Sequence, residues 1–315
     1  MVRRSVLATF MVMAIVLGGV AVSTPASAVI DSAVVIPSPN TGANTNNLYS
    51  VSCVTASFCV ATGTYNNGVT AQTLVLQWDG TAWTVLPSPN AGANANVLNS
   101  VSCVTASFCV ATGTYNNGVT AQTLVLQWDG TAWTVMPSPN AGTNANVLSV
   151  LYSVSCVTAS FCVAAGNYDN GVAGQTLVLQ WDGTAWTVMP SPNTGTDSNF
   201  LYSVSCVNAS FCVATGAYGY VFNRSASQTL VLQWDGTAWT VMPSPNTGTD
   251  DNALNSVLCV TASSCVATGY YINGSVEQTL VVSLTGPVPP STTTTTVPPS
   301  TTTVASDQVV PVFTG

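Results

Sequence analysis

Hydrophobic and polar residues alternate in a pattern that returns five times along the chain. In its first copy, apolar side chains predict β-strands at residues 48–54, 58–62, 72–78 and 81–86. Asp79-Gly80 between the last two strands predicts a two-residue type I′ hairpin, with Trp78 opposite Thr81 and Leu76 opposite Trp83. One face of this hairpin then carries Leu74, Leu76, Trp78, Trp83 and Val85, and the other carries Val75, Ala82 and Leu86. Apolar groups on both faces indicate a sheet packed between two other sheets.

The repeat length indicates the architecture. The five copies begin at Pro37, Pro87, Pro137, Pro190 and Pro243, spaced 50, 50, 53 and 53 residues apart. Repeats of this length with several short strands are typical of propeller blades, because a single blade cannot bury both of its faces. The sequence therefore predicts an all-β fold, a five-bladed β-propeller of four-stranded blades.

The two ends of the array predict how the ring closes. The first four repeats each end in a Trp-Asp-Gly-Thr-Ala-Trp hairpin, whereas the fifth stops near Gly286 without an outer strand. Residues 31–40 align with the missing outer strand and carry Ala33 in place of tryptophan. We therefore expect the propeller to span residues 29–286, with the N-terminal strand completing the fifth blade and closing the ring.

The ten cysteines predict a disulfide framework. They form one pair per repeat, always six residues apart: Cys53 and Cys59, Cys103 and Cys109, Cys156 and Cys162, Cys206 and Cys212, and Cys259 and Cys265. An even count at fixed spacing in an exported chain favours five local bridges. The chain has no histidine and no Cys-x-x-Cys motif, so we expect no zinc site.

The two termini predict an exported protein. Residues 1–28 combine Arg3 and Arg4, a short apolar stretch and Ala26-Ser27-Ala28, which is typical of a cleaved signal peptide rather than a membrane anchor. Residues 287–315 are rich in threonine and proline and predict a disordered stalk. The expected location is secreted, with association to the cell surface left open.

Charge excludes two classes of partner. Cleavage of the signal peptide leaves eleven acidic residues against Arg224 alone. Nucleic acids and anionic membrane surfaces both require basic patches, so neither is expected as a partner. No apolar run after the signal reaches the length of a membrane helix, so we expect no membrane insertion after cleavage and a monomer in solution.

The repeats also carry a family resemblance. The motifs VSCVTASFCVATG and QTLVLQWDGTAWTVMPSPN resemble the cysteine-hairpin, W-D-G-x-x-W repeats of secreted bacterial proteins grouped with kelch and galactose-oxidase-like propellers. The resemblance covers nearly all of residues 31–286 and implies the propeller fold. Five repeats, four of which carry a tryptophan pair, are also similar in architecture to five-bladed lectins, an analogy that assigns no binding residue.

The chain offers little chemistry beyond carboxylates. After signal cleavage it has neither histidine nor lysine, so a serine or cysteine nucleophile lacks a base, and we expect no enzyme and no catalytic residue. The hairpin aspartates Asp79, Asp129, Asp182 and Asp235 are interpreted as turn residues. Asp197, Asp250 and Asp251 lie in loops between repeats, where they are solvated carboxylates, calcium ligands or a glycosidase pair. No cofactor is expected, and calcium stays an open alternative.

A second set of loops supplies candidate ligand-binding residues. A tyrosine beside amide hydrogen bonders is a reasonable sugar subsite, although Asn-Gly is also explained as a turn. The candidates are Tyr65, Asn66, Asn67, Tyr115, Asn116, Asn117, Tyr168, Asp169, Asn170, Tyr271 and Asn273, together with Arg224 in the divergent fourth repeat.

Near-identical repeats predict near-identical surfaces, and several weak sites together raise avidity. We therefore expect a non-catalytic module that binds extracellular glycans or proteins through its loops. A glycoside hydrolase and a purely structural surface protein are the alternatives.

Overall fold

The computed structural model describes residues 33–42, 44–141, 148–220, 226–248 and 250–286. Its contacts divide the chain into two units, residues 1–37 and 38–315, and the second unit holds all the strands among these residues. The predicted signal peptide, the stalk and Arg224 lie outside the described residues.

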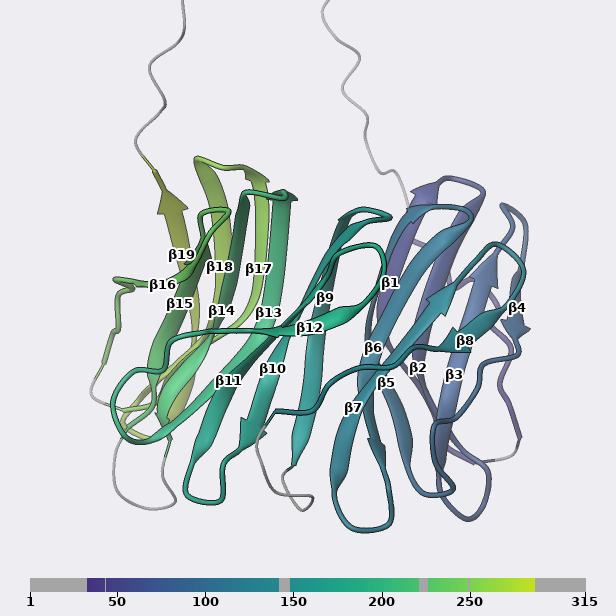
Figure 1. The fold of residues 1–315 in the computed structure, drawn as a ribbon, viewed down its shortest axis with the longest axis horizontal. Helices are drawn as coiled ribbons and strands as arrows, with labels where there is room; N and C mark the ends of the chain where they lie inside the picture. Colours follow the sequence, from purple (N-terminus) through teal and green to yellow (C-terminus); the bar gives the residue numbers. More distant parts are fainter. Residues whose placement is uncertain (1–32, 43, 142–147, 221–225, 249, 287–315) are drawn as a thin grey trace, which may run out of the picture. The chain divides into compact units, whose positions relative to one another are not determined.

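The described residues form five antiparallel sheets and contain no helix, which confirms the predicted all-β class (Figure 1). Neighbouring strands within each sheet follow one another in the sequence, so every connection is a hairpin. The sheets are β1 (Asn46–Thr55), β2 (Phe58–Asn66), β3 (Ala71–Trp78) and β4 (Trp83–Leu86); β5 (Asn96–Thr105), β6 (Phe108–Asn116), β7 (Ala121–Trp128) and β8 (Trp133–Val135); β9 (Ser149–Thr158), β10 (Phe161–Asp169), β11 (Gly174–Trp181) and β12 (Trp186–Met189); β13 (Ser198–Asn208), β14 (Phe211–Tyr220), β15 (Gln228–Trp234) and β16 (Trp239–Met242); and β17 (Asn252–Thr261), β18 (Ser264–Asn273) and β19 (Val276–Thr285).

The register of the tryptophan hairpin differs from the prediction. Trp78 pairs with Trp83, and Leu76 pairs with Val85, so the turn has four residues rather than two. The Asp79 carboxylate explains the longer turn, because it accepts hydrogen bonds from the backbone N–H groups of Thr81 and Ala82 and from the Thr81 hydroxyl, at 2.7–2.8 Å. The shift is even, so the predicted division of side chains between the two faces is unchanged.

All five predicted disulfides are present, each joining directly paired residues of the first two strands of a sheet. A second link ties the third strand to the same hairpin. The indole N–H of Trp128 donates to the carbonyl oxygen of Ala106 at 3.0 Å, within the turn between β5 and β6. The corresponding bond recurs in the other sheets that carry tryptophan.

A shift in strand pairing that recurs in every sheet requires glycine. The pairing of β5 with β6 shifts between Leu98 and Ser100, where Gly113 lies opposite Leu98. A Cβ atom at Gly113 would collide with the carbonyl oxygen of Val97. The same collision would occur at the matching glycine of each sheet, so a side chain at this place cannot be accommodated without moving the first strand.

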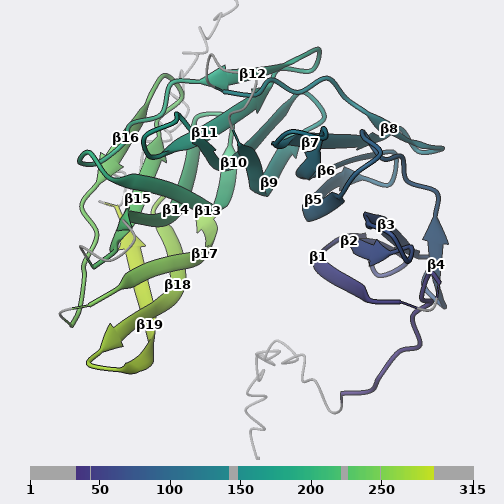
Figure 2. The ribbon, with the colours of Figure 1, turned by 90° about the horizontal axis from the view of Figure 1, so that it is seen from below.

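Each sheet packs on the next one along the chain, with the first strands of successive sheets in contact (Figure 2). Leucine and valine side chains from both sheets form each core, as where Val75 of the first sheet packs with Leu98 and Leu124 of the second. A pair of hydrogen bonds accompanies each packing. Ser50 and Ser52 accept with their Oγ atoms from the backbone N–H groups of Val101 and Cys103, at 3.1 and 3.0 Å.

The same pair of serine bonds joins the second sheet to the third, the third to the fourth and the fourth to the fifth. In the fifth sheet Ser256 occupies the first serine position, but Leu258 replaces the second serine and is 66% exposed. All bonds of this serine ladder have the same direction: a backbone N–H group of one sheet donates to a serine hydroxyl oxygen of the preceding sheet.

The fifth sheet has three strands among the described residues, and β19 is its last. Residues 33–40, which align with the outer strand of the other repeats, carry no strand. Val51 lies on the face of the first sheet that is turned away from the second sheet and is 60% exposed. Val281 lies on the face of the fifth sheet that is turned away from the fourth sheet and is 67% exposed. Completion of the fifth sheet by the N-terminal segment, and with it ring closure, stays a prediction.

Candidate functional site

Three aromatic rings gather on the first strands of the third and fourth sheets. Tyr152 of β9 meets Tyr202 of β13 edge to face, with ring centroids 5.8 Å apart and an interplanar angle of 67°. Phe200, also on β13, stacks on Tyr202 at 6.2 Å and 4°. All three side chains are half-buried, so each ring keeps part of its surface open. We call Tyr152, Phe200 and Tyr202 the aromatic cluster.

A bulge in β13 accompanies this arrangement. Phe200 and Tyr202 are two residues apart, and the pairing of β13 with β14 shifts between Leu201 and Ser203, so Tyr202 lies at the bulge. Tyr152 and Tyr202 occupy the same place in their repeats, between a buried leucine and a serine of the ladder. Asparagine takes this place in the second and fifth repeats, and Tyr49 takes it in the first.

An amide lies beside the cluster on the next strand. Asn99 of β5 corresponds to Tyr152, and its side-chain N–H donates to the carbonyl oxygen of Leu151 at 2.8 Å. Leu151 directly precedes Tyr152, so this bond holds the Asn99 amide close to the cluster. The amide oxygen of Asn99 can then accept a hydrogen bond from a ligand. The surface thus combines flat apolar rings, a hydroxyl group and an amide, without a charged side chain among these four residues.

A glycine makes room for the cluster. A Cβ atom at Gly174 would lie 3.1 Å from two ring atoms of Phe200, closer than ordinary contact. The first two repeats have Ala71 and Ala121 at this place, and neither is followed by a phenylalanine in the next sheet. Glycine therefore replaces alanine in the repeat that is followed by Phe200 in the next sheet.

The tyrosine hydroxyl of the cluster is a stable donor. Burial raises the pKa of Tyr152 above its ordinary value of 10.0, because desolvation disfavours the phenolate. The hydroxyl therefore stays protonated at neutral pH and can donate a hydrogen bond.

The loop candidates from the sequence lie at one edge of the sheets, and much of their polarity serves the turns. Asn66 accepts from the backbone N–H of Gly68, and Asn67 accepts from those of Val69 and Thr70, at 2.8–2.9 Å. Asn116, Asn117, Asp169 and Asn170 make the same bonds in the next two repeats.

The tyrosines of these loops are partly buried against hydrophobic cores; they are Tyr65, Tyr115 and Tyr168. In the fifth sheet Tyr271 pairs with Asn252, and Asn273 ends β18. The structural role of the asparagines is thus explicit, whereas a role of these loops in ligand binding stays a prediction.

The loop aspartates are brought to the same edge. Asp251 accepts with its carboxylate from the backbone N–H of Ser227 at 2.6 Å, and its carbonyl oxygen accepts from Ile272 at 2.7 Å. The backbone carbonyls of Asp197 and Asp250 accept from the side chains of Asn199 and Asn252. Among the residues that the structure describes, no three His, Cys, Asp or Glu side chains gather to hold a metal ion, and calcium binding stays a prediction.

The hairpin aspartates are turn residues, as predicted. The hydroxyl of the threonine two residues on, followed by two backbone N–H groups, lowers the pKa of Asp129, Asp182 and Asp235 from 3.8 to about 2. Such hydrogen bonds favour the ionised form, so these carboxylates are anions at all physiological pH values.

The aromatic cluster was not anticipated from the sequence. The available signal was the occurrence of tyrosine at one place in three of the five repeats, but contact between Tyr152 and Tyr202 depends on the packing of two sheets.

No protein-family model matches the sequence, and no curated protein matches it either. Solved structures do resemble it. A protein of unknown function from Dyadobacter fermentans has 13% identity and a TM-score of 0.52, over 75% of each chain. The lectin SapL1 in complex with alpha methyl fucoside has 15% identity and a TM-score of 0.46, over 76% of this chain and 80% of that one.

Two further similar structures are an enzyme and a peptide-bound protein. An alpha-L-arabinanase of Penicillium chrysogenum complexed with arabinobiose has 8% identity and a TM-score of 0.47, over 75% of this chain and 77% of that one. YCF48 bound to D1 peptide has 12% identity and a TM-score of 0.42; 74% of this chain spans 65% of that one. At these identities the likeness shows the fold alone, which is an all-β fold of the propeller type.

These comparisons correct one prediction. The sequence predicts that the chain is not an enzyme, yet the similar structures include an arabinanase and an arabinofuranosidase. The exclusion of catalysis is therefore wrong.

The disulfides bear on location. Five bridges indicate an extracellular protein, because disulfides persist in oxidising compartments. Within the described residues, no helix has the length and apolar character needed to cross a membrane.

Proposed function

We propose that this chain is a secreted or surface-displayed propeller that recognises extracellular carbohydrate, and that the aromatic cluster is its principal contact. The observation that carries the proposal is the stack of Phe200 and Tyr202 beside Tyr152, with open ring surface on adjacent strands. Sugar rings present apolar C–H faces and hydroxyl groups. Aromatic rings with polar tips and a nearby amide match both features.

Charge supports the same class of ligand. The cluster and Asn99 carry no ionisable group that is charged at neutral pH, so a neutral sugar binds without the cost of desolvating an ion. The tyrosine and asparagine loops, including Tyr65, Asn66 and Asn67, are proposed as additional subsites. Their repetition would raise avidity for a polymeric glycan through multivalent contact. An extracellular protein is the alternative partner.

The test is a glycan array with the secreted protein, followed by affinity measurement for each bound sugar. Tyr202→Ala removes the ring shared by both aromatic contacts and should weaken binding by about tenfold or more. Tyr49→Ala is the matched control, because Tyr49 holds the same place in the first repeat and lies outside the cluster. Unchanged affinity of the Tyr202 variant for every bound glycan would refute the assignment of the site.

Glycoside hydrolysis is the second candidate. Asp251 has one carboxylate oxygen fixed by the backbone N–H of Ser227, on the edge that also holds Asp250. Acid–base cleavage of a glycosidic bond requires two carboxyl groups that flank the bond about 5–9.5 Å apart, and Asp197, Asp250 and Asp251 are the candidates for that pair. Release of reducing sugar from plant and bacterial polysaccharides is the assay. Loss of turnover in Asp197→Asn, Asp250→Asn or Asp251→Asn would support hydrolysis. Inactivity of the wild-type protein on all the polysaccharides tested would reject it.

A further inference from the structure

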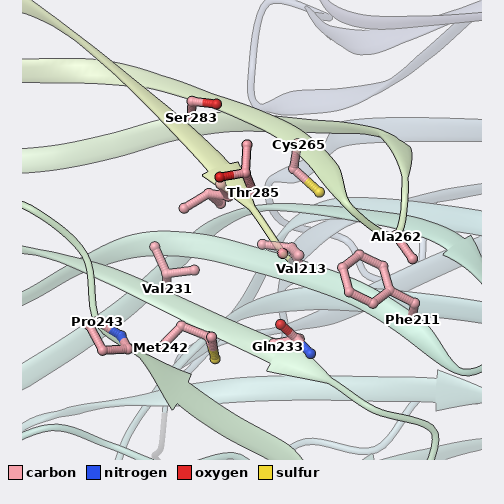
Figure 3. Close-up of a pocket in the computed structure, with 12 residues that line it drawn as sticks. Phe211, Val213, Val231, Gln233, Met242, Pro243, Ala262, Cys265, Ser283 and Thr285 are labelled. Carbon is pink, nitrogen blue, oxygen red and sulfur yellow. The ribbon is translucent and has the colours of Figure 1, made fainter. Parts of the chain in front are cut away.

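A hollow lies between the fourth and fifth sheets, with a volume of about 220 Å³ (Figure 3). The fourth sheet supplies Phe211 and Val213 from β14, Val231 from β15 and Met242 from β16. The fifth sheet supplies Cys265 and Leu284. Val213 and Val231 are almost fully buried, and no Asp, Glu, Lys or Arg lines the hollow.

At the equivalent place between the other sheets lies a pair of tryptophans, with an open groove of about 400–450 Å³ beside it. Trp234 and Trp239 of the fourth sheet pack into a core with Phe161, Val163 and Met189 of the third. Trp181 and Trp186 pack in the same way against the second sheet, and Trp128 and Trp133 against the first. The side of the hollow formed by the fourth sheet therefore has the same kinds of residue as the side of each earlier sheet against which a tryptophan pair packs.

The fifth repeat lacks both rings. Leu284 pairs with Cys265 where Trp234 pairs with Cys212, so leucine stands in the place of the first tryptophan. All eight tryptophans of the chain belong to the first four repeats. The N-terminal segment that aligns with the missing outer strand has Ala33 at the second tryptophan position, so the chain itself supplies no indole here.

A hydrogen-bond acceptor remains at the same place. In each of the first four sheets the first tryptophan donates its indole N–H to an alanine carbonyl at 3.0–3.1 Å; the four alanines are Ala56, Ala106, Ala159 and Ala209. Ala262 is their counterpart in the fifth sheet, and it lines the hollow. The hollow thus combines apolar side chains from both sheets with the polar residues Gln233, Ser283 and Thr285, and with a carbonyl that corresponds to the acceptor of the indole N–H in the other sheets.

We propose that this hollow is a ligand site for a small, neutral, flat aromatic molecule with an N–H donor, of the indole type. The hollow, with a volume of about 220 Å³, is larger than the cavity of about 150 Å³ that binds benzene, so it has room for a bicyclic ring. The ring packs between Val231, Met242 and Leu284, and its N–H donates to the carbonyl oxygen of Ala262. The site is separate from the aromatic cluster and does not depend on carbohydrate recognition.

Methionine methyl groups provide a direct readout with internal controls. After signal cleavage the chain contains Met136, Met189 and Met242, one at the same place in each of three successive repeats. Only Met242 lines the hollow, because Met136 and Met189 pack against tryptophan pairs. In the intact secreted protein with labelled methionine methyls, indole should shift the Met242 signal and leave the other two in place.

Indene, which has the same bicyclic frame without the N–H group, tests the acceptor. Loss of one hydrogen bond should weaken binding by about fivefold relative to indole. Equal affinities would overturn the role of the Ala262 carbonyl. Absence of a shift at Met242 with saturating indole, or equal shifts at all three methionines, would overturn the site itself.

Leu284→Trp restores the missing ring and fills the hollow from within. It should abolish the indole shift at Met242 and raise the unfolding temperature, because filling a cavity recovers lost contacts. Ser275→Trp is the matched control, since Ser275 is exposed in the turn between β18 and β19, does not line the hollow and should leave indole binding intact. Unreduced indole binding to a folded Leu284→Trp variant would contradict the proposal.

Discussion

Ring closure is testable at a single hydroxyl group. Ser203 accepts with its Oγ atom from the backbone N–H of Val257 at 3.1 Å, as part of the serine ladder between the fourth and fifth sheets. Ser256 occupies the same place in the fifth sheet. If the fifth sheet packs on the first as the ladder implies, Ser256 accepts from the backbone N–H of Val51. Ser256→Ala removes only this acceptor.

The two serines should then behave alike. Ser203→Ala leaves a partly buried backbone N–H without a partner, which costs about 1–3 kcal/mol of unfolding free energy. In a closed ring Ser256→Ala should cost a similar amount. At an uncovered surface the same change stays within about 0.5 kcal/mol of wild type.

Chemical denaturation followed by tryptophan fluorescence measures both effects, through the shift of the midpoint at unchanged slope. Ser203→Ala is the positive control. A loss for Ser203→Ala together with an unaltered midpoint for Ser256→Ala would refute closure by sheet-on-sheet packing.

Three further results are expected. Replacing Cys103 and Cys109 together by alanine should lower the free energy of unfolding by about 2 kcal/mol, the loop entropy of so short a bridge, as measured by denaturation. The pKa of Asp129, about 2 in the folded chain, should rise toward 3.8 in Thr131→Val, which an NMR titration of the carboxyl detects. Because this folded pKa lies below the unfolded value, the stabilisation by Asp129 is complete above about pH 4 and is lost as pH falls toward 2. Gly113→Ala should abolish secretion of folded protein, assayed by the yield of oxidised chain; a normal yield would contradict the collision at this strand.

The strands and bridges were predictable because they depend on nearby residues. The cysteines lie six residues apart and pair directly, and the apolar alternation continues through each strand. The hairpin register was not predictable from Asp-Gly alone, because the Asp79 carboxylate stabilises a four-residue turn through three donors. The Asp79 carboxylate and the positive φ of Gly80, 98°, together determine the turn.

The candidate sites depend on packing between sheets, which the sequence does not specify residue by residue. Tyr152 and Tyr202 are 50 positions apart in the chain, and only the contact of β9 with β13 brings their rings together. The missing tryptophans of the fifth repeat indicated that its packing on the fourth sheet differs from that of the other sheets. The volume of the hollow and its polar anchor at Ala262 required the structure.

The indole bonds and disulfides described above also bear on how the chain folds during export. In each tryptophan-bearing sheet, the bridge joins residues six positions apart, and the bond from Trp128 to Ala106 spans only 22. Such short separations let each sheet assemble as soon as its own segment has emerged, since little loop entropy is lost. Each folded sheet then presents an apolar face on which the next sheet packs. Oxidation can therefore proceed in order along the chain, with few wrongly paired thiols to be reshuffled.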